Sequence, residues 1–192
     1  SIVLYLNLKK GTAEATAKKD SYFSTLKVAI KEAKNPRVAL AYTAGIVSRG
    51  DLAVVSTFFA LWLGIEFQSL GMSKPEAQKM AALLYVAVQA CAIPGALLIN
   101  FFIDKFDRVV ALAISMAIAA TGYLYLGFID DVTGYEMYIG VGLLGLGEIF
   151  ANISAISLIG TVAPPKARGA VIGGFSFFGA VGIFLVAGIG GQ

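Results

Sequence analysis

Five uninterrupted apolar stretches constrain the fold of this chain more than any other feature of its sequence. They run over about 38–65, 80–103, 109–129, 137–163 and 169–190. Each is close to or above the roughly 20 residues that an α-helix needs to cross the hydrocarbon core of a bilayer. Strands of a membrane barrel would instead alternate in polarity over about 10 residues. The sequence therefore predicts an all-α, multi-pass integral membrane protein, and it leaves open which membrane holds it.

The composition supports this class and argues against others. Of the 192 residues, 58% are hydrophobic and 14% are charged, whereas an ordinary soluble domain carries about 25% charged residues. A net charge of +3 gives no support for nucleic-acid binding. The sequence has no His, no Cys pair and no Ser placed beside a base. We therefore expect no enzyme activity, no metal and no other cofactor.

The chain is predicted to divide into an N-terminal segment, 1–37, and a five-span bundle, 38–192. Residues 2–8 are apolar but too short to cross a bilayer, so we interpret them as the end of a truncated earlier span. Behind them, Phe23, Leu26 and Ile30 recur at helical spacing after Asp20, a candidate N-cap. This pattern predicts a short amphipathic helix on the membrane surface, and an ordinary linker helix with a solvated basic face fits equally well.

The basic residues predict the orientation of the spans. Twelve of the fifteen Lys and Arg residues lie in the N-terminal segment and in the two loops on its side of the predicted membrane. The opposite loops hold two, Lys74 and Lys79, together with several acidic residues. Because loops rich in Lys and Arg stay in the cytoplasm, the N-terminal segment is predicted to be cytoplasmic.

Three charged residues fall in the middle of predicted spans. On a scale of membrane insertion, each such charge raises the insertion free energy by about 2.5 to 3.5 kcal/mol, whereas each Leu, Ile, Phe or Val lowers it by only about 0.3 to 0.6 kcal/mol. At about 1.5 Å per residue, Arg49 and Glu148 each lie about 16 Å from opposite faces of a roughly 30 Å core, and Asp51 shares that level. Asn152 follows Glu148 by one turn on the same face. Such residues normally face a bundle interior or an aqueous path.

Arg49 and Asp51, two residues apart, point to nearly opposite sides of a helix. At least one therefore needs a partner on another helix, and Glu148 has the right sign for Arg49. A static bridge that only fixes helix packing is the alternative. Phe58 and Trp62, with Ser48 before them, are candidates for the wall of a solute site, although aromatic residues near a span end are more often interface anchors.

Glycine patterns in two spans predict close helix packing. The string "GVGLLG", from Gly140 to Gly145, fits a dinucleotide fingerprint but lies inside an apolar stretch with no preceding strand. Its glycines, like the spaced pair Gly169 and Gly173, are better explained by close approach of helices.

Two loops on the predicted cytoplasmic side resemble those of a known family. "NFFIDKFDR" is similar to the short signature of the major facilitator superfamily, in which Asp104, Lys105 and Arg108 match, while Asn100 and Asp107 stand where glycines are usual. "APPKARGAVIGG", with Arg168, resembles the other cytoplasmic loop of that family. The chain as a whole resembles the C-terminal half of such a transporter, from the end of its sixth helix through its eleventh.

The resemblance implies a function and a set of partners. It places Arg49 and Asp51 on the seventh helix and Glu148 on the tenth, which line the central cavity, and puts the uncharged ninth helix outside. It implies secondary active transport of a small solute by alternating access, with proton or cation coupling at Asp51 and Glu148. The partners would be the solute, the lipid bilayer and the missing N-terminal half. The alternative is a non-transporting half-transporter, a structural subunit of a larger membrane assembly.

Overall fold

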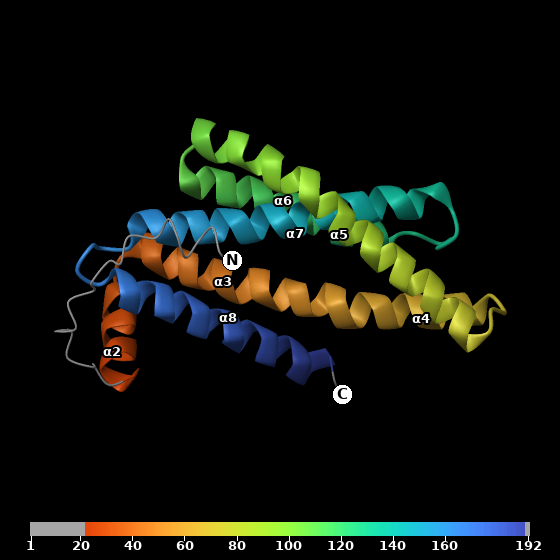
Figure 1. Ribbon diagram of the computed structural model, residues 1–192, viewed down its shortest axis with the longest axis horizontal. Coiled ribbons are helices and arrows are strands. Elements are labelled where there is room, and N and C mark those ends of the chain that lie inside the picture. Colours follow the sequence, from red (N-terminus) through yellow and green to blue (C-terminus); the bar gives the residue numbers. More distant parts are fainter. Residues whose placement is uncertain (1–21, 191–192) are drawn as a thin grey trace, which may run out of the picture.

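The protein is a bundle of long helices, shown in Figure 1 by a computed structural model that describes residues 22–190. The apolar stretch 2–8 and the candidate N-cap Asp20 lie outside these residues. The elements are α2 (Tyr22–Glu32), α3 (Pro36–Ala53), a π-helix η1 (Val54–Phe59), α4 (Ala60–Ser69), α5 (Lys74–Lys105), α6 (Arg108–Gly127), α7 (Tyr135–Val162) and α8 (Arg168–Gly190).

Five helical segments in this range are long and apolar enough to cross a bilayer, with α3, η1 and α4 forming the first of them. The described residues contain no strand. The prediction of an all-α membrane bundle is therefore confirmed.

Polar caps set the helix starts. Asn35 accepts a hydrogen bond from the backbone nitrogen of Arg37 at 3.0 Å, just before Pro36, so the first span begins at 36 instead of 38. Ser73 and Glu76 form a capping box at the start of α5. This box explains why the second span begins six residues earlier than its apolar stretch.

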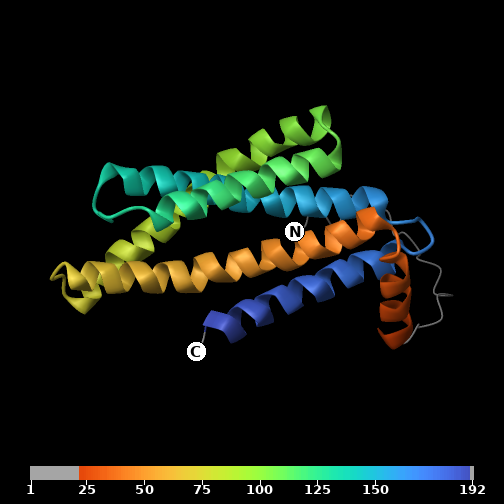
Figure 2. The same cartoon turned by 180° about the vertical axis from the view of Figure 1, so that it is seen from behind.

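Helix α7 is the centre of the bundle. It packs against α6, α5 and α3, whereas α8 lies mainly along α3, as both views show (Figures 1 and 2). More than half of the most apolar window of α7 is buried (56%), against 22–33% for the other spans. Helix α7 is therefore in contact with neighbouring helices around most of its circumference.

The glycines of α7 allow this central position. A Cβ added at Gly145 would clash with the carbonyl oxygen of Val88 on α5, and one added at Gly147 would clash with the backbone of Ala119 on α6. A Cβ on Gly140 would run into Leu126 of α6. The prediction that the glycines of 140–145 permit close helix approach is confirmed for Gly140 and Gly145.

The glycine prediction for α8 is not tested at its two residues, because an added Cβ at Gly169 or Gly173 would meet nothing within 4 Å among residues 22–190. The close approach to α3 is made further along, at Gly179 and Gly182, where a Cβ on Gly182 would clash with the carbonyl oxygen of Ile46. Several glycines in α8 have a similar spacing, and the position of α3 decides which of them lie at the close contact between the two helices.

The predicted helix in the N-terminal segment is present as α2. It lies across the end of the bundle (Figure 1) and packs against α8. Its Ala29 is fully buried and accepts a hydrogen bond from the hydroxyl of Tyr42 at 3.3 Å. Tyr22 and Phe23 in its first turn are 94% and 79% exposed and form an apolar face at the start of α2. Contact of that face with a membrane surface stays a prediction.

Candidate functional site

Three polar side chains from three helices meet inside the bundle. Asp51, in the last turn of α3, accepts a hydrogen bond from the hydroxyl of Tyr123 on α6. Glu148 on α7 is 8% exposed, and the charges of Asp51 and Glu148 are close enough to act on each other and on Tyr123. The side chain of Gln89 on α5 lies within reach of the Glu148 carboxyl. We call Asp51, Tyr123 and Glu148 the acidic cluster.

The fold brings the acidic cluster together through the central helix. Because α7 packs against both α3 and α6, Glu148 lies close to the other two members. At least one of Arg49 and Asp51 was expected to need a partner on another helix, and Asp51 has one in Tyr123. Tyr123 was missed because it is uncharged and lies in an apolar stretch, where it carries no signal that separates it from an interface aromatic.

Arg49 lies on another side of α3. A Cβ placed on Gly179 of α8 would approach the Arg49 Cγ at 2.8 Å, so the aliphatic part of this side chain crosses α8. Within residues 22–190, Arg49 forms no ion pair with Glu148. Their interaction, in this or another conformation of the transport cycle, stays a prediction.

Two further predicted residues carry buried atoms without partners. The Ser48 hydroxyl oxygen and the Asn152 side-chain oxygen are buried and form no hydrogen bond in the described part of the chain. Ser48 precedes Asp51 by about one turn, and Asn152 follows Glu148 by one turn. A buried polar atom left unpaired costs about 1 to 3 kcal/mol, so each needs an explanation such as a water, an ion or a solute.

The predicted aromatic residues are used for packing in this structure. Trp62 packs against a buried cluster that contains Phe59 and Leu63, with its ring centroid 5.9 Å from that of Phe59. The ring of Phe58 lies where a Cβ on Gly190 of α8 would stand. A role for Phe58 and Trp62 in a solute site stays a prediction.

A π-helix follows the acidic cluster directly. Segment η1 covers Val54–Phe59, starting three residues after Asp51. Well under 1% of residues in globular proteins adopt this conformation, and π-helical turns occur frequently at functional sites. No pattern of charge or hydropathy in the six residues distinguishes them from an α-helix, which is why the sequence did not predict it.

The cluster borders a pocket between three helices. About 350 Å³ of space is lined by Asp51 of α3, Val54 of η1, Tyr123 of α6, and Gly182 and Leu185 of α8, with other apolar residues. A solute or ion in this space would be able to reach the Asp51 carboxylate.

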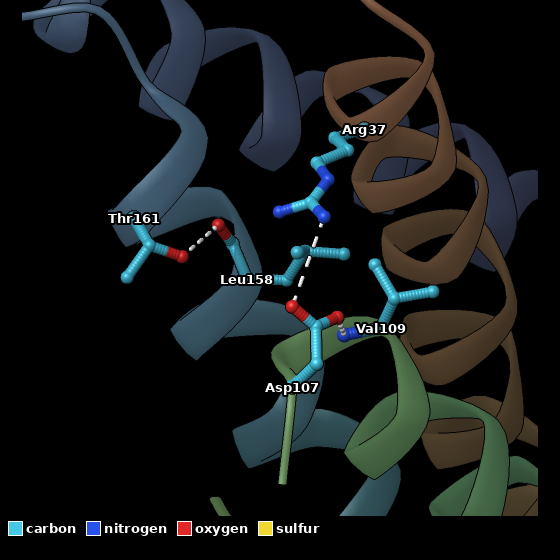
Figure 3. Close-up of polar contacts among 5 residues, drawn as sticks. All are labelled: Arg37, Asp107, Val109, Leu158 and Thr161. Carbon is cyan, nitrogen blue, oxygen red and sulfur yellow. Dashed lines mark hydrogen bonds and ion pairs between the residues drawn. The ribbon is translucent and has the colours of Figure 1, made fainter.

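The loop signature is split between two kinds of contact. Asp107 accepts a hydrogen bond from the backbone nitrogen of Val109 at 2.9 Å and forms an ion pair with Arg37 at 3.7 Å (Figure 3). Arg108 donates a hydrogen bond to the Ser157 hydroxyl on α7. Figure 3 also shows Thr161 bonded to the carbonyl of Leu158 on that helix.

Asp104, Lys105 and Arg168 are exposed, and no ion pair or side-chain hydrogen bond involves them within residues 22–190. The structure therefore brings only part of the predicted signature into contact.

Charged residues inside the spans of a helical membrane bundle usually mark an ion or substrate pathway. Residues 1–187 match the Major Facilitator Superfamily, and the chain belongs to this family. The predicted family and the integral membrane location are thus confirmed.

Curated relatives are similar at low identity. The magnetosome protein MamZ of Magnetospirillum gryphiswaldense is 26% identical over 157 residues, which are 82% of this chain and 24% of MamZ. The magnetosome protein MamH of Paramagnetospirillum magneticum is 26% identical over 156 residues, 81% of this chain and 36% of MamH. The chain therefore spans about a quarter to a third of the length of these relatives. No solved structure matches it.

Proposed function

We propose that the protein is part of a secondary transporter that moves a small solute by alternating access and couples this movement to a proton or a cation. The observation that supports the proposal most strongly is the acidic cluster. Two carboxylates from different spans, Asp51 and Glu148, lie near each other and share Tyr123 as a neighbour. Ionisable residues inside spans are costly and usually mark ion or substrate pathways.

The cluster has the chemistry of a coupling site. Two negative charges repel each other more strongly inside a bundle than in water, because the effective dielectric constant is lower there. A bound proton or monovalent cation would offset this repulsion, and its release would restore it. Binding would therefore change the interactions that hold α3, α6 and α7 together, which is what a coupled conformational change requires.

Transport by the complete protein tests this proposal. Proteoliposomes would be screened with radiolabelled sugars, amino acids, organic acids and metal cations, with and without an inward proton or sodium gradient. Asp51→Asn and Glu148→Gln should abolish gradient-driven accumulation while exchange of labelled for unlabelled solute continues, since exchange needs no net ion movement. Asp130→Asn, in an exposed loop, is the control and should accumulate solute normally. Loss of exchange together with accumulation would contradict the coupling role.

The competing hypothesis is a non-transporting subunit that contributes packing surface to a larger assembly. It predicts a mature polypeptide of about 200 residues, whereas a complete transporter of this family would have about 400 from its roughly 20-residue spans and their loops. The mass of the protein purified from its native membrane separates the two hypotheses.

The shared name of the relatives supports one proposal about location. MamZ and MamH are both magnetosome proteins, and we propose a magnetosome membrane as the first place to look for this chain. A fluorescent fusion spread evenly over the cell membrane would contradict this proposal.

A further inference from the structure

A second pocket lies away from the acidic cluster, between α4 and α5. It has a volume of about 640 Å³, and its polar lining residues are Ser56, Thr57, Gln68, Lys74, Gln78 and Tyr85. The two helices pack against each other near their shared turn, and α5 then crosses α7 towards α6 (Figures 1 and 2). We call this pocket the α4–α5 groove.

The groove reaches from the end of the bundle to the middle of the membrane. Gln68 and Lys74 lie beside the α4–α5 turn, whereas Ser56 and Tyr85 lie about 16 to 20 Å along their helices at about 1.5 Å per residue. That is roughly half of a hydrocarbon core of about 30 Å. The end lined by Gln68 and Lys74, which we call the mouth, lies on the side that the distribution of Lys and Arg predicts to be opposite the cytoplasm.

The polar lining is unusual for the surface of a membrane span. Further along α5, the large exposed side chains between 93 and 101 are apolar: Ile93, Leu97 and Phe101 are 71%, 72% and 81% exposed. That composition suits contact with lipid tails. Ser56 donates a hydrogen bond to the carbonyl of Ala53 at 3.4 Å. Polar groups of the lining that have no such partner would be left unpaired in lipid, at a cost of several kcal/mol each. The groove is therefore better suited to water, a solute or another polypeptide segment than to lipid tails.

Its hydrogen-bonding groups are mostly free to bind a ligand. The side chains of Thr57, Gln78 and Tyr85 form no hydrogen bond within residues 22–190. Gln68 uses its amide nitrogen on the carbonyl oxygen of Gly64 at 2.7 Å, which leaves its side-chain oxygen. Ser56 and Thr57 are placed by the π-helix η1, a conformation found frequently at functional sites.

The charge of the lining indicates the class of ligand. Among the lining residues, Lys74 carries a full positive charge and no acidic residue is present. The acidic members of the neighbouring capping box and cluster, Glu76 and Asp51, line other pockets. Hydroxyls and amides donate to anionic oxygens, and an ammonium group makes such contacts stronger.

We propose that the α4–α5 groove is an entry site for a small oxyanion, a carboxylate or a phosphate, which Lys74 attracts at the mouth and Thr57 and Tyr85 receive at mid-membrane depth. This inference rests on the proposed transport function and names the class of its solute. It assigns to the groove a binding role that is separate from ion coupling at the acidic cluster.

The test measures protection of a cysteine in the groove, and it needs no transport. The complete protein with Cys91→Ala and Gln78→Cys would be labelled in detergent with a charged, water-soluble thiosulfonate. The probes are acetate, succinate, citrate and inorganic phosphate, with glycerol and choline as uncharged and cationic controls. At least one of the four oxyanions should slow the labelling of position 78, and glycerol and choline should not.

Removal of the charge identifies the binding residue. Lys74→Gln should weaken protection by about tenfold in anion concentration, the size expected when a hydrogen bond to a charged group is lost. Lys79→Gln is the matched control, because Lys79 is exposed on the same helix but lines a different pocket. It should leave protection unchanged. Tyr85→Phe tests whether the anion also binds deeper in the groove. It should weaken protection if the Tyr85 hydroxyl contacts the anion, and it should leave protection unchanged if the anion binds only at Lys74.

Each other outcome overturns the inference. Failure of all four oxyanions to protect, equal protection by glycerol or choline, or an effect of Lys79→Gln as large as that of Lys74→Gln would each exclude an anion site at Lys74. A cysteine at position 78 that does not react at all would show that the groove is closed to water, which would also exclude an entry site for an anion. Protection without any uptake in proteoliposomes would contradict the transport function but support the anion site. Coupled uptake without protection would support the transport function but contradict the anion site.

Discussion

The hydrogen bond between Asp51 and Tyr123 is a direct contact between two members of the acidic cluster, and a double-mutant cycle tests it. Tyr123→Phe removes the hydroxyl and keeps the ring, so packing on α6 is preserved. Asp51→Ala removes the carboxylate that accepts the hydrogen bond. The double variant removes both groups. The coupling free energy of the cycle measures the contact itself, provided that neither single change creates a new interaction.

The expected magnitude follows from the environment of the pair. Hydrogen bonds to charged groups contribute about 1.5 to 3 kcal/mol in soluble proteins. Measured cycles between membrane helices average about 0.6 kcal/mol and reach about 1.7, because the unfolded chain in the membrane also finds partners. Both side chains are half-buried and one is charged, so we expect a value in the upper part of the membrane range, about 1 to 1.5 kcal/mol.

The assay is reversible unfolding of the complete protein in mixed micelles with a rising fraction of a denaturing detergent. Tyr123→Phe alone should lower the free energy of unfolding by about 1 to 2 kcal/mol, because it leaves the carboxylate without its donor. Tyr125→Phe on the same helix is the control, since no hydrogen bond involves its hydroxyl in the described part of the chain. A coupling energy below about 0.3 kcal/mol, the usual error of additivity, would refute the contact.

Three further changes test other parts of the structure in the same assay. Replacing Arg49 or Glu148 alone by Gln should lower stability or activity if the two side chains pair during transport. The double replacement should recover stability, because no buried charge is then left unpaired. Additive losses of stability would show that the two side chains never meet. Gly182→Leu should lower the free energy of unfolding by about 1 to 3 kcal/mol or more, because its side chain would overlap the carbonyl of Ile46; a neutral effect would contradict the α3–α8 packing. Asp107→Ala should cost about 1 to 2 kcal/mol from the lost helix cap and the exposed ion pair, and an unchanged stability would show that neither contact contributes.

The existence and number of the spans could be predicted because a bilayer imposes a length and a composition on each helix. The depth of Arg49, Asp51 and Glu148 could be calculated for the same reason. Their partners could not, because a partner depends on the rotation of each helix about its own axis. That rotation follows from packing, and the rotation of α3 places Asp51 towards Tyr123 and Arg49 over α8.

The glycines show the same limit of prediction from sequence, because their contacts also depend on how each helix is rotated. Residues Gly140 and Gly145 of α7 were predicted to permit close approach, and they do, because α7 has neighbours on most sides and nearly any small residue on it meets one. Helix α8 has its main neighbour, α3, on one side. Only the glycines on that side are used, and spacing alone did not distinguish Gly182 from Gly173.

The loop between α5 and α6 shows what a departure from a family pattern can mean. Asp107 stands where the family commonly has a second glycine, and the structure uses it as the cap of α6 and as the counter-ion of Arg37. A glycine could do neither, since it has no side-chain oxygen.

Asp107 and Arg108 are thus occupied by contacts within the bundle, whereas Asp104 and Lys105 have none among residues 22–190. The two exposed residues therefore have charges that a neighbouring part of the complete protein could contact, and a role in transport stays a prediction. Contacts that must break and reform in every cycle are better made by exposed charges than by a buried pair, because the charges are solvated in both states and their separation costs little.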